Sequence, residues 1–107
     1  KVSKKVAKRN GLGGGQDSFS DTVFLLSRLE VGLGTEGTTT GEFVYPFYDG
    51  ITDAGRIKQL NGSNMVWWLR SPDVSHSSSV RSVGTKGILN TYYTFDPRGV
   101  SPACVII

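Results

Sequence analysis

The stretch MVWWLRSP, Met65–Pro72, predicts the inner strand on which the fold depends. Its first five residues are a short run of large apolar side chains, and Arg70-Ser71-Pro72 ends the run, which is typical of a strand bounded by a turn. Successive side chains of a strand point to opposite faces of the sheet. We therefore expect one of Trp67 and Trp68 in the core and the other against a helix, a loop or a ligand, with both packed as structural residues.

Two further apolar runs predict the partners of this strand. Thr22–Ser27 (TVFLLS) has the length and continuous apolar character of a buried central strand, and Ala103–Ile107 (ACVII) predicts a last buried strand. Val80–Val83 and Ile88–Phe95 flank Gly84–Gly87, which predicts a β-hairpin. The three apolar runs are expected to meet as inner strands of one small core.

Short helical segments are expected between the strands. Ser27 followed by Glu30 forms a capping-box pattern, which predicts one helical turn through Leu29–Val31. A second short helix is expected at roughly Ala54–Leu60, closed by Asn61-Gly62. The predicted fold class is α+β, mainly antiparallel β with one or two short helices.

The composition limits the classes of function. The 107 residues make one domain, and no apolar run approaches the roughly 18 residues of a membrane-spanning helix. A single cysteine and a single histidine exclude an internal disulfide framework and a Cys/His zinc site built by this chain alone. The carboxylates are scattered along the sequence, so we expect neither a metal nor a cofactor.

The net charge of +3 is concentrated at the N-terminus. Five positive residues and no acid occupy the first ten positions, so the remainder carries seven positive and nine negative residues. Val2–Lys8 fits a strand or a short helix, and Gly11–Gly15 interrupts it. We expect residues 1–21 to be a basic strand or arm with a glycine-rich linker and residues 22–107 to be the domain. The arm lacks aromatic residues for stacking on bases, which argues against nucleic acid.

Several segments together resemble one uncharacterised domain family of gut bacteria and their phages. They are FLLS (Phe24–Ser27), YPFY (Tyr45–Tyr48), RIKQLNG (Arg56–Gly62), WWLRSP (Trp67–Pro72) and GVSPACVI (Gly99–Ile106). The hallmark of that family is WWLRSP followed by GVRPA, and here Ser101 replaces the arginine of the second motif whereas Arg70 is retained.

The resemblance implies a C-type-lectin-like layout, the fold of variable phage receptor-binding proteins and of formylglycine-generating enzymes. It also implies that the chain is the C-terminal part of a larger protein.

The candidate binding surface combines the loop Asp73–Ser79 with part of the segment Asn90–Arg98, because short polar and tyrosine side chains form adaptable contact surfaces. Since Tyr92 and Tyr93 are adjacent, only one of them is expected to join this surface. The candidate binding residues are Asp73, Ser75, His76, Ser77, Ser78, Arg81, Tyr92, Tyr93 and Arg98.

Arg70 is expected to be structural, like Trp67 and Trp68. A guanidinium directly after an apolar strand can neutralise a buried carboxylate or bind loop carbonyls, and Asp53 and Asp73 are candidate partners.

Catalysis is not expected. Cys104 lies in an apolar run with nothing nearby to activate it, which predicts a buried, inert thiol. Asp73, Ser75 and His76 could be combined as a triad on paper, but residues so close in sequence rarely reach triad geometry.

The predicted function is a non-enzymatic binding or display module of a phage virion or a bacterial cell surface, recognising a protein or a glycan. The first alternative is a purely structural module of a larger assembly, whose basic arm docks on an acidic neighbour. The second alternative is a remnant of a formylglycine-generating-enzyme-like scaffold.

Overall fold

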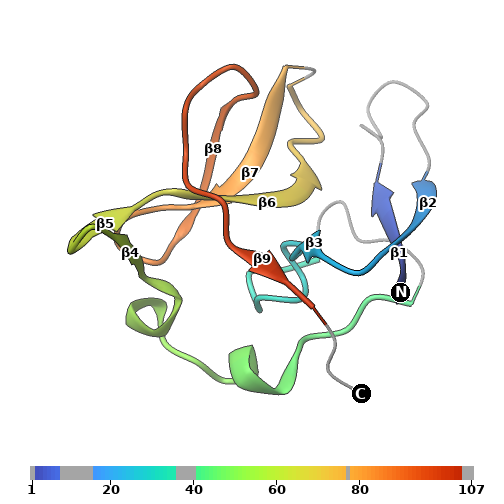
Figure 1. Cartoon of the computed structure of the whole chain (residues 1–107), viewed down its shortest axis with the longest axis horizontal. Coiled ribbons are helices and arrows are strands. Elements are labelled where there is room, and N and C mark those ends of the chain that lie inside the picture. The colour runs from blue at the N-terminus through green and yellow to red at the C-terminus, as the bar shows by residue number, and fades with distance from the viewer. Residues whose placement is uncertain (1, 8–15, 36–40, 77, 105–107) are drawn as a thin grey trace.

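The computed structural model describes residues 2–7, 16–35, 41–76 and 78–104 and shows a chain of short antiparallel strands (Figure 1). The pairs β1–β2, β3–β9 and β4–β5 form two-stranded sheets, and β6, β7 and β8 form a three-stranded sheet in that order. The strands are β1 (Val2–Ala7), β2 (Gln16–Asp21), β3 (Phe24–Leu25), β4 (Lys58–Leu60), β5 (Ser63–Met65), β6 (Trp67–Pro72), β7 (Ser79–Val83), β8 (Leu89–Tyr93) and β9 (Pro102–Ala103). The mainly antiparallel β prediction is confirmed.

Helical structure in the described part of the chain is limited to two 3-10 turns, η2 (Pro46–Tyr48) and η3 (Asp53–Arg56). The helix predicted at Ala54–Leu60 is wrong, because β4 begins at Lys58 and pairs with β5. Asn61 and Gly62 link these strands with φ angles of 54° and 82°. Two successive residues with positive φ give the turn whose twist matches a hairpin, so this Asn-Gly pair turns a β-ribbon and does not end a helix.

The core lies against one face of β6. Burial alternates along β6, with Trp67, Leu69 and Ser71 buried and the residues between them half-buried. Trp67 is 2% exposed and its indole Nε1 donates to the Arg56 carbonyl at 3.1 Å, whereas Trp68 is half-buried on the other face. The core residues are Phe24, Leu26, Val31, Tyr48, Trp67, Leu69 and Val83. The prediction that the two tryptophans point to opposite faces is confirmed.

The other two predicted inner strands differ from the expectation in the residues that the structure describes. Only Phe24–Leu25 of the first run is a strand, while Val23 is 56% exposed. In the last run β9 ends at Ala103 and Cys104 is exposed, and residues 105–107 lie outside the described part of the chain. A continuous apolar run reveals neither where pairing begins nor which face is covered. The prediction of a buried strand is wrong at Cys104, which lies beyond β9 and is exposed, so the predicted buried thiol is wrong as well.

The predicted turn after β3 is confirmed as a reciprocal cap. The Ser27 backbone N–H donates to Glu30 Oε1 at 3.0 Å, and the Glu30 backbone N–H donates to Ser27 Oγ at 3.3 Å. The Val31 N–H donates to the Ser27 carbonyl at 3.3 Å, which closes a single hydrogen-bonded turn that does not continue as a helix. This turn carries the Glu30 carboxylate into the interior, where Glu30 is fully buried.

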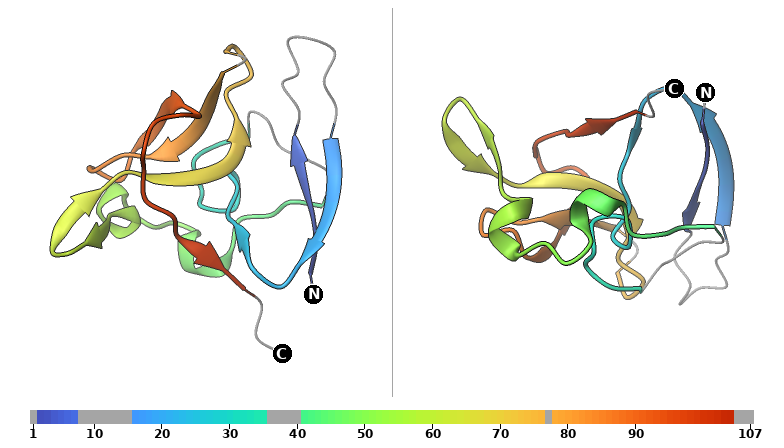
Figure 2. Two further views of the ribbon diagram at one scale, coloured as in Figure 1. Left: turned by 45° about the horizontal axis from the view of Figure 1, so that its top comes forward. Right: turned by 90° about the horizontal axis from the view of Figure 1, so that it is seen from below.

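The basic N-terminal segment forms β1, which pairs with β2 as a hairpin beside the rest of the fold (Figure 2). Lys4 attaches β1 to the body, because its Nζ lies 2.8 Å from Glu30 Oε2 and 2.5 Å from Tyr45 Oη. The Lys4 ammonium also lies 4.9 Å from the centre of the Phe24 ring. Of the two conformations that the sequence allowed for Val2–Lys8, the structure shows the strand over Val2–Ala7, and Lys8 lies outside the described residues.

Candidate functional site

Arg70 pairs with a buried carboxylate, which belongs to Glu30. The two guanidinium nitrogens Nη1 and Nη2 donate to Glu30 Oε1 and Oε2 at 2.6 and 2.9 Å, and Nη1 also donates to the Leu25 carbonyl at 2.9 Å. This two-pronged pair joins β6 to the turn after β3. Of the two expected partners of Arg70, Asp53 forms an ion pair with Arg56 at 3.2 Å. Asp73 accepts a hydrogen bond from the Ser75 backbone N–H in the loop after β6.

Asp73 organises the predicted binding loop from inside. Its side chain is almost fully buried, and its Oδ1 accepts the Ser75 backbone N–H at 3.0 Å. Its Oδ2 lies 3.1 Å from His76 Nδ1 and accepts the Thr91 hydroxyl at 3.1 Å. Arg81 Nη2 lies 4.0 Å from Oδ1. Asp73 therefore fixes the loop to β8 and orients the exposed His76 ring; it does not itself face solvent.

The two buried carboxylates make stability depend on acid pH. Burial alone would raise the pKa of Glu30, but hydrogen bonds from Arg70, Lys4 and the Ser27 backbone outweigh it and lower that pKa below its ordinary 4.5. Burial would likewise raise the pKa of Asp73, and hydrogen bonds to it lower its pKa below 3.8.

A carboxylate with a lowered folded pKa stabilises the fold above its unfolded pKa, and this stabilisation is lost as pH falls through the folded pKa. We therefore expect the melting temperature, measured from pH 7 to pH 3, to begin falling near pH 4.5 and to keep falling towards pH 3. Asp73→Asn, compared at each pH, should flatten the lower part of that decline. A melting temperature that stays constant down to pH 3 contradicts the lowered pKa values.

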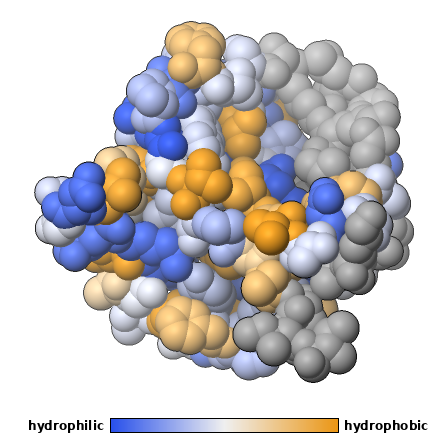
Figure 3. Space-filling model, in the orientation of Figure 1, coloured by the Kyte–Doolittle hydropathy of each residue, from blue (hydrophilic) through white to orange (hydrophobic). Residues whose placement is uncertain are grey.

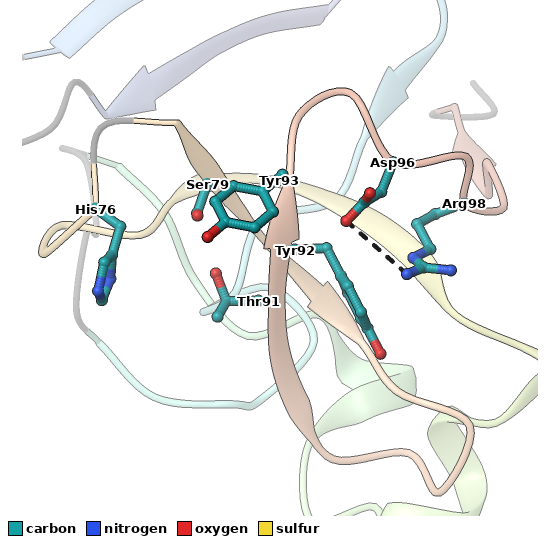
Figure 4. Close-up of a pocket in the computed structure, with 7 residues that line it drawn as sticks. All are labelled: His76, Ser79, Thr91, Tyr92, Tyr93, Asp96 and Arg98. Carbon is teal, nitrogen blue, oxygen red and sulfur yellow. Dashed lines mark ion pairs between the residues drawn. The ribbon is translucent and has the colours of Figure 1, made fainter.

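A hollow of about 350 Å³ lies over β8 and the segment that follows it (Figure 4). Its lining residues are His76, Ser79, Thr91, Tyr92, Tyr93, Asp96 and Arg98. Four of these seven, His76, Tyr92, Tyr93 and Arg98, are among the predicted binding residues. Asp73 and Arg81 lie behind the hollow and hold its loop, Ser75 and Ser78 are exposed without lining it, and Ser77 lies outside the described residues.

Tyr92 and Tyr93 both line the hollow, so the expectation that only one of them joins the surface is wrong. They do point to opposite sides of β8 (Figure 4). However, β8 is the last strand of its sheet, and a hollow at the edge of a sheet can reach both faces of the outermost strand. Two adjacent strand residues cannot both join a surface that is one face of a sheet. They can both join a surface at the edge of the sheet, and the sequence does not reveal which strand lies at an edge.

Each tyrosine has an ordered neighbour. The Arg98 guanidinium lies 3.9 Å from the centre of the Tyr92 ring, and the Tyr93 and Phe95 rings stack with centres 5.2 Å apart and planes 4° apart. Tyr93 is 54% exposed and Phe95 is 77% exposed. Arg98 Nη2 lies 3.9 Å from Asp96 Oδ2, and Arg98 Nε is shielded from solvent without a hydrogen-bond partner. The hollow thus offers flat aromatic faces, a loosely paired cation and an imidazole.

Exposed apolar side chains alone would not have identified this site. On the face shown in Figure 3, apolar groups are separated by hydrophilic ones and do not merge into one broad patch. Phe47 is 70% exposed, nearly as much as Phe95, yet it does not line this hollow. The distinguishing feature is the convergence of the loop after β6, β8 and the segment after β8.

Among the described residues, no group of three or more His, Cys, Asp or Glu side chains could hold a metal ion. No helix in the same part of the chain is long and apolar enough to cross a membrane. Cys104 lines a small apolar recess with Phe24, Leu26 and Tyr45, apart from His76 and Asp73.

A family model described as domain of unknown function, DUF6273, matches residues 1–107. No curated protein and no solved structure gives a match.

Proposed function

This chain belongs to the DUF6273 domain family, and we propose that it is a non-enzymatic binding module that recognises a protein or a glycan. The observation that carries the proposal is the hollow lined by His76, Tyr92, Tyr93 and Arg98. Tyrosine and arginine side chains contribute a large share of the energy at protein recognition surfaces. Tyrosine also presents a rigid amphipathic face at a low entropic cost.

The rigidity of the surroundings supports a recognition role. The buried Asp73 ties the loop that carries His76 to Thr91 of β8, so two walls of the hollow are held by one carboxylate. The Arg98 guanidinium is held over the Tyr92 ring. A surface whose contact groups are ordered before binding loses less conformational entropy when the ligand arrives.

We further propose a C-type-lectin-like layout and a place on a phage virion or a bacterial cell surface. The support is the resemblance of the WWLRSP segment to a family of gut bacteria and phages, together with short antiparallel strands joined by long irregular connections. In this arrangement the loop after β6 and the segment after β8 would form the displayed end of the domain.

Alanine substitutions at the hollow test the proposal. We expect Tyr92→Ala, Tyr93→Ala and Arg98→Ala each to weaken binding to glycan arrays or to intact bacterial cells at least tenfold, which corresponds to about 1.4 kcal/mol. His76→Ala should have a smaller effect, because His76 lies on the exposed rim.

Phe47→Ala is the matched control, since it removes an exposed aromatic ring that does not line the hollow. Binding by the unmodified chain that persists in all four hollow variants, each shown to be folded by its melting temperature, rules out this surface as the contact site.

A further inference from the structure

The hydrogen-bond register shows which backbone groups of β8 are unused. Gly84 N–H donates to the Ile88 carbonyl at one end of the β7–β8 hairpin, and Thr94 N–H donates to the Ser78 carbonyl at the other. Bonded pairs alternate with non-bonded pairs along an antiparallel ladder. The even-numbered residues Asn90 and Tyr92 therefore carry the bonds to β7.

The odd-numbered residues of β8 consequently direct their backbone groups away from the sheet. These are Leu89, Thr91 and Tyr93, opposite Val83, Arg81 and Ser79 in the register. The Tyr93 carbonyl accepts the Asp96 N–H at 3.0 Å, and the sheet order places no further strand of the described chain beside β8. The N–H groups of all three residues, and the carbonyls of Leu89 and Thr91, thus form an open edge.

The shape of the hollow matches this edge. Thr91 and Tyr93 lie on one side of the strand, and Tyr92 and Arg98 lie on the other (Figure 4). A strand added beside β8 would direct its own side chains alternately to these two sides. The hollow therefore offers room on both faces of the one position that an added strand would occupy.

We propose that β8 binds an extended peptide segment of a partner protein as a fourth strand of the β6–β7–β8 sheet. The inference rests on the proposed binding function and specifies its ligand class. Main-chain hydrogen bonds to Leu89, Thr91 and Tyr93 hold the peptide, and the two sides of the hollow select its side chains. An apolar or aromatic residue packs against the exposed Tyr93–Phe95 stack on one side.

The other side of the hollow selects an acidic residue. The Arg98 guanidinium is held over Tyr92 and its Nη2 lies 3.9 Å from Asp96, so a carboxylate from the peptide can bind the guanidinium at shorter range than Asp96 does. The preferred segment alternates apolar and acidic side chains, which agrees with its extended form.

Hydrogen exchange on the full chain tests the open edge directly. In the free protein, the amides of Leu89, Thr91 and Tyr93 should exchange at least tenfold faster than those of Asn90 and Tyr92. A displayed library of linear peptides of about ten residues, selected on the full chain, should yield binders that slow exchange at the first three amides. N-methylation at alternate positions of such a peptide should abolish binding in one register and spare it in the other.

A proline substitution gives the matched pair of variants. Thr91→Pro removes an outward N–H without removing a bond to β7, a position where edge strands tolerate proline. Thr91→Val keeps that N–H and, like the proline variant, removes the hydroxyl that donates to Asp73 and to the Val80 carbonyl. We expect peptide affinity to be at least tenfold lower in Thr91→Pro than in Thr91→Val, because both variants lack the hydroxyl and only the proline variant lacks the outward N–H.

Several results would overturn strand addition. The first is a library that yields no binders, and the second is a set of binders indifferent to N-methylation and to Thr91→Pro. Concentration-dependent association of the chain with itself, lost in Thr91→Pro, would identify a second copy as the occupant. Oligosaccharide binding that is lost in Tyr93→Ala but retained in Thr91→Pro would overturn the peptide ligand while leaving the proposed binding function standing.

Discussion

Replacing Glu30 with glutamine is expected to lower the free energy of unfolding by about 3 kcal/mol. Glu30 is fully buried and receives Arg70 on both carboxylate oxygens and Lys4 on one of them. Glutamine can still accept the Ser27 N–H, so the capping turn keeps an acceptor, but two largely buried cations lose their counter-charge. Urea titration at pH 7 measures the change.

Asp49→Asn is the control for loss of one negative charge, because Asp49 is exposed and the substitution should change stability by less than about 0.5 kcal/mol. Glu30→Gln combined with Arg70→Met removes the more buried of the two cations that contact Glu30 and should recover at least about 1 kcal/mol relative to Glu30→Gln alone. If Glu30→Gln costs no more than Asp49→Asn, the cluster does not hold β1 and β6 to the turn after β3.

The parts of the fold that were predicted correctly are those encoded by neighbouring residues. The Ser27–Glu30 cap needs only a spacing of three residues, and it forms as expected. The hairpin of β7 and β8 follows from two runs around a glycine-bounded turn. The alternation of Trp67 and Trp68 follows from strand geometry alone. Each of these features is fixed within a few residues.

The Glu30–Arg70 pair shows why other features could not be predicted. Its two residues are 40 positions apart in the sequence. The capping interaction with Ser27 already gave Glu30 a role within its own turn, so the sequence did not point to a distant partner. The helix predicted to end at Asn61-Gly62 was wrong for a related reason, because the same dipeptide can end a helix or form the turn of a hairpin. Only the pairing of β4 with β5, which depends on the rest of the fold, distinguishes the two.

The candidate site was half predicted for the same physical reason. The composition of the loop after β6 pointed to His76, and the tyrosine pair pointed to β8. Asp96 was missed as a site residue because its place in the hollow comes from the path of the chain after β8, and Ser79 and Thr91 were missed although they lie within the two predicted segments. The buried position of Asp73 depends on contacts with Thr91, 18 residues away. The composition of a loop indicates that it can form a contact surface. Which of its residues are buried and hold the loop, and which face a ligand, depends on the packed structure.

Trp67→Ala is expected to cost about 4 kcal/mol of stability. Trp67 is 2% exposed among the core residues, so its removal leaves a cavity that the short strands around it cannot close. The substitution also removes the indole donor from the Arg56 carbonyl. Arg56 in turn donates to the Val31 carbonyl at 2.6 Å. Losing the indole bond to Arg56 should therefore also weaken the attachment of the segment after Glu30.

Trp68→Ala is the matched control, since it removes the same side chain from the adjacent position and the opposite face of β6. Trp68 is half-buried, so we expect less than half the cost of Trp67→Ala. Trp67→Phe separates the two contributions at position 67, because it keeps most of the apolar volume and removes the hydrogen bond to Arg56. Its cost should fall between those of the two alanine variants. Equal costs for Trp67→Ala and Trp68→Ala would mean that both faces of β6 are equally covered, and the core would then have to extend across the sheet to the side that carries Trp68.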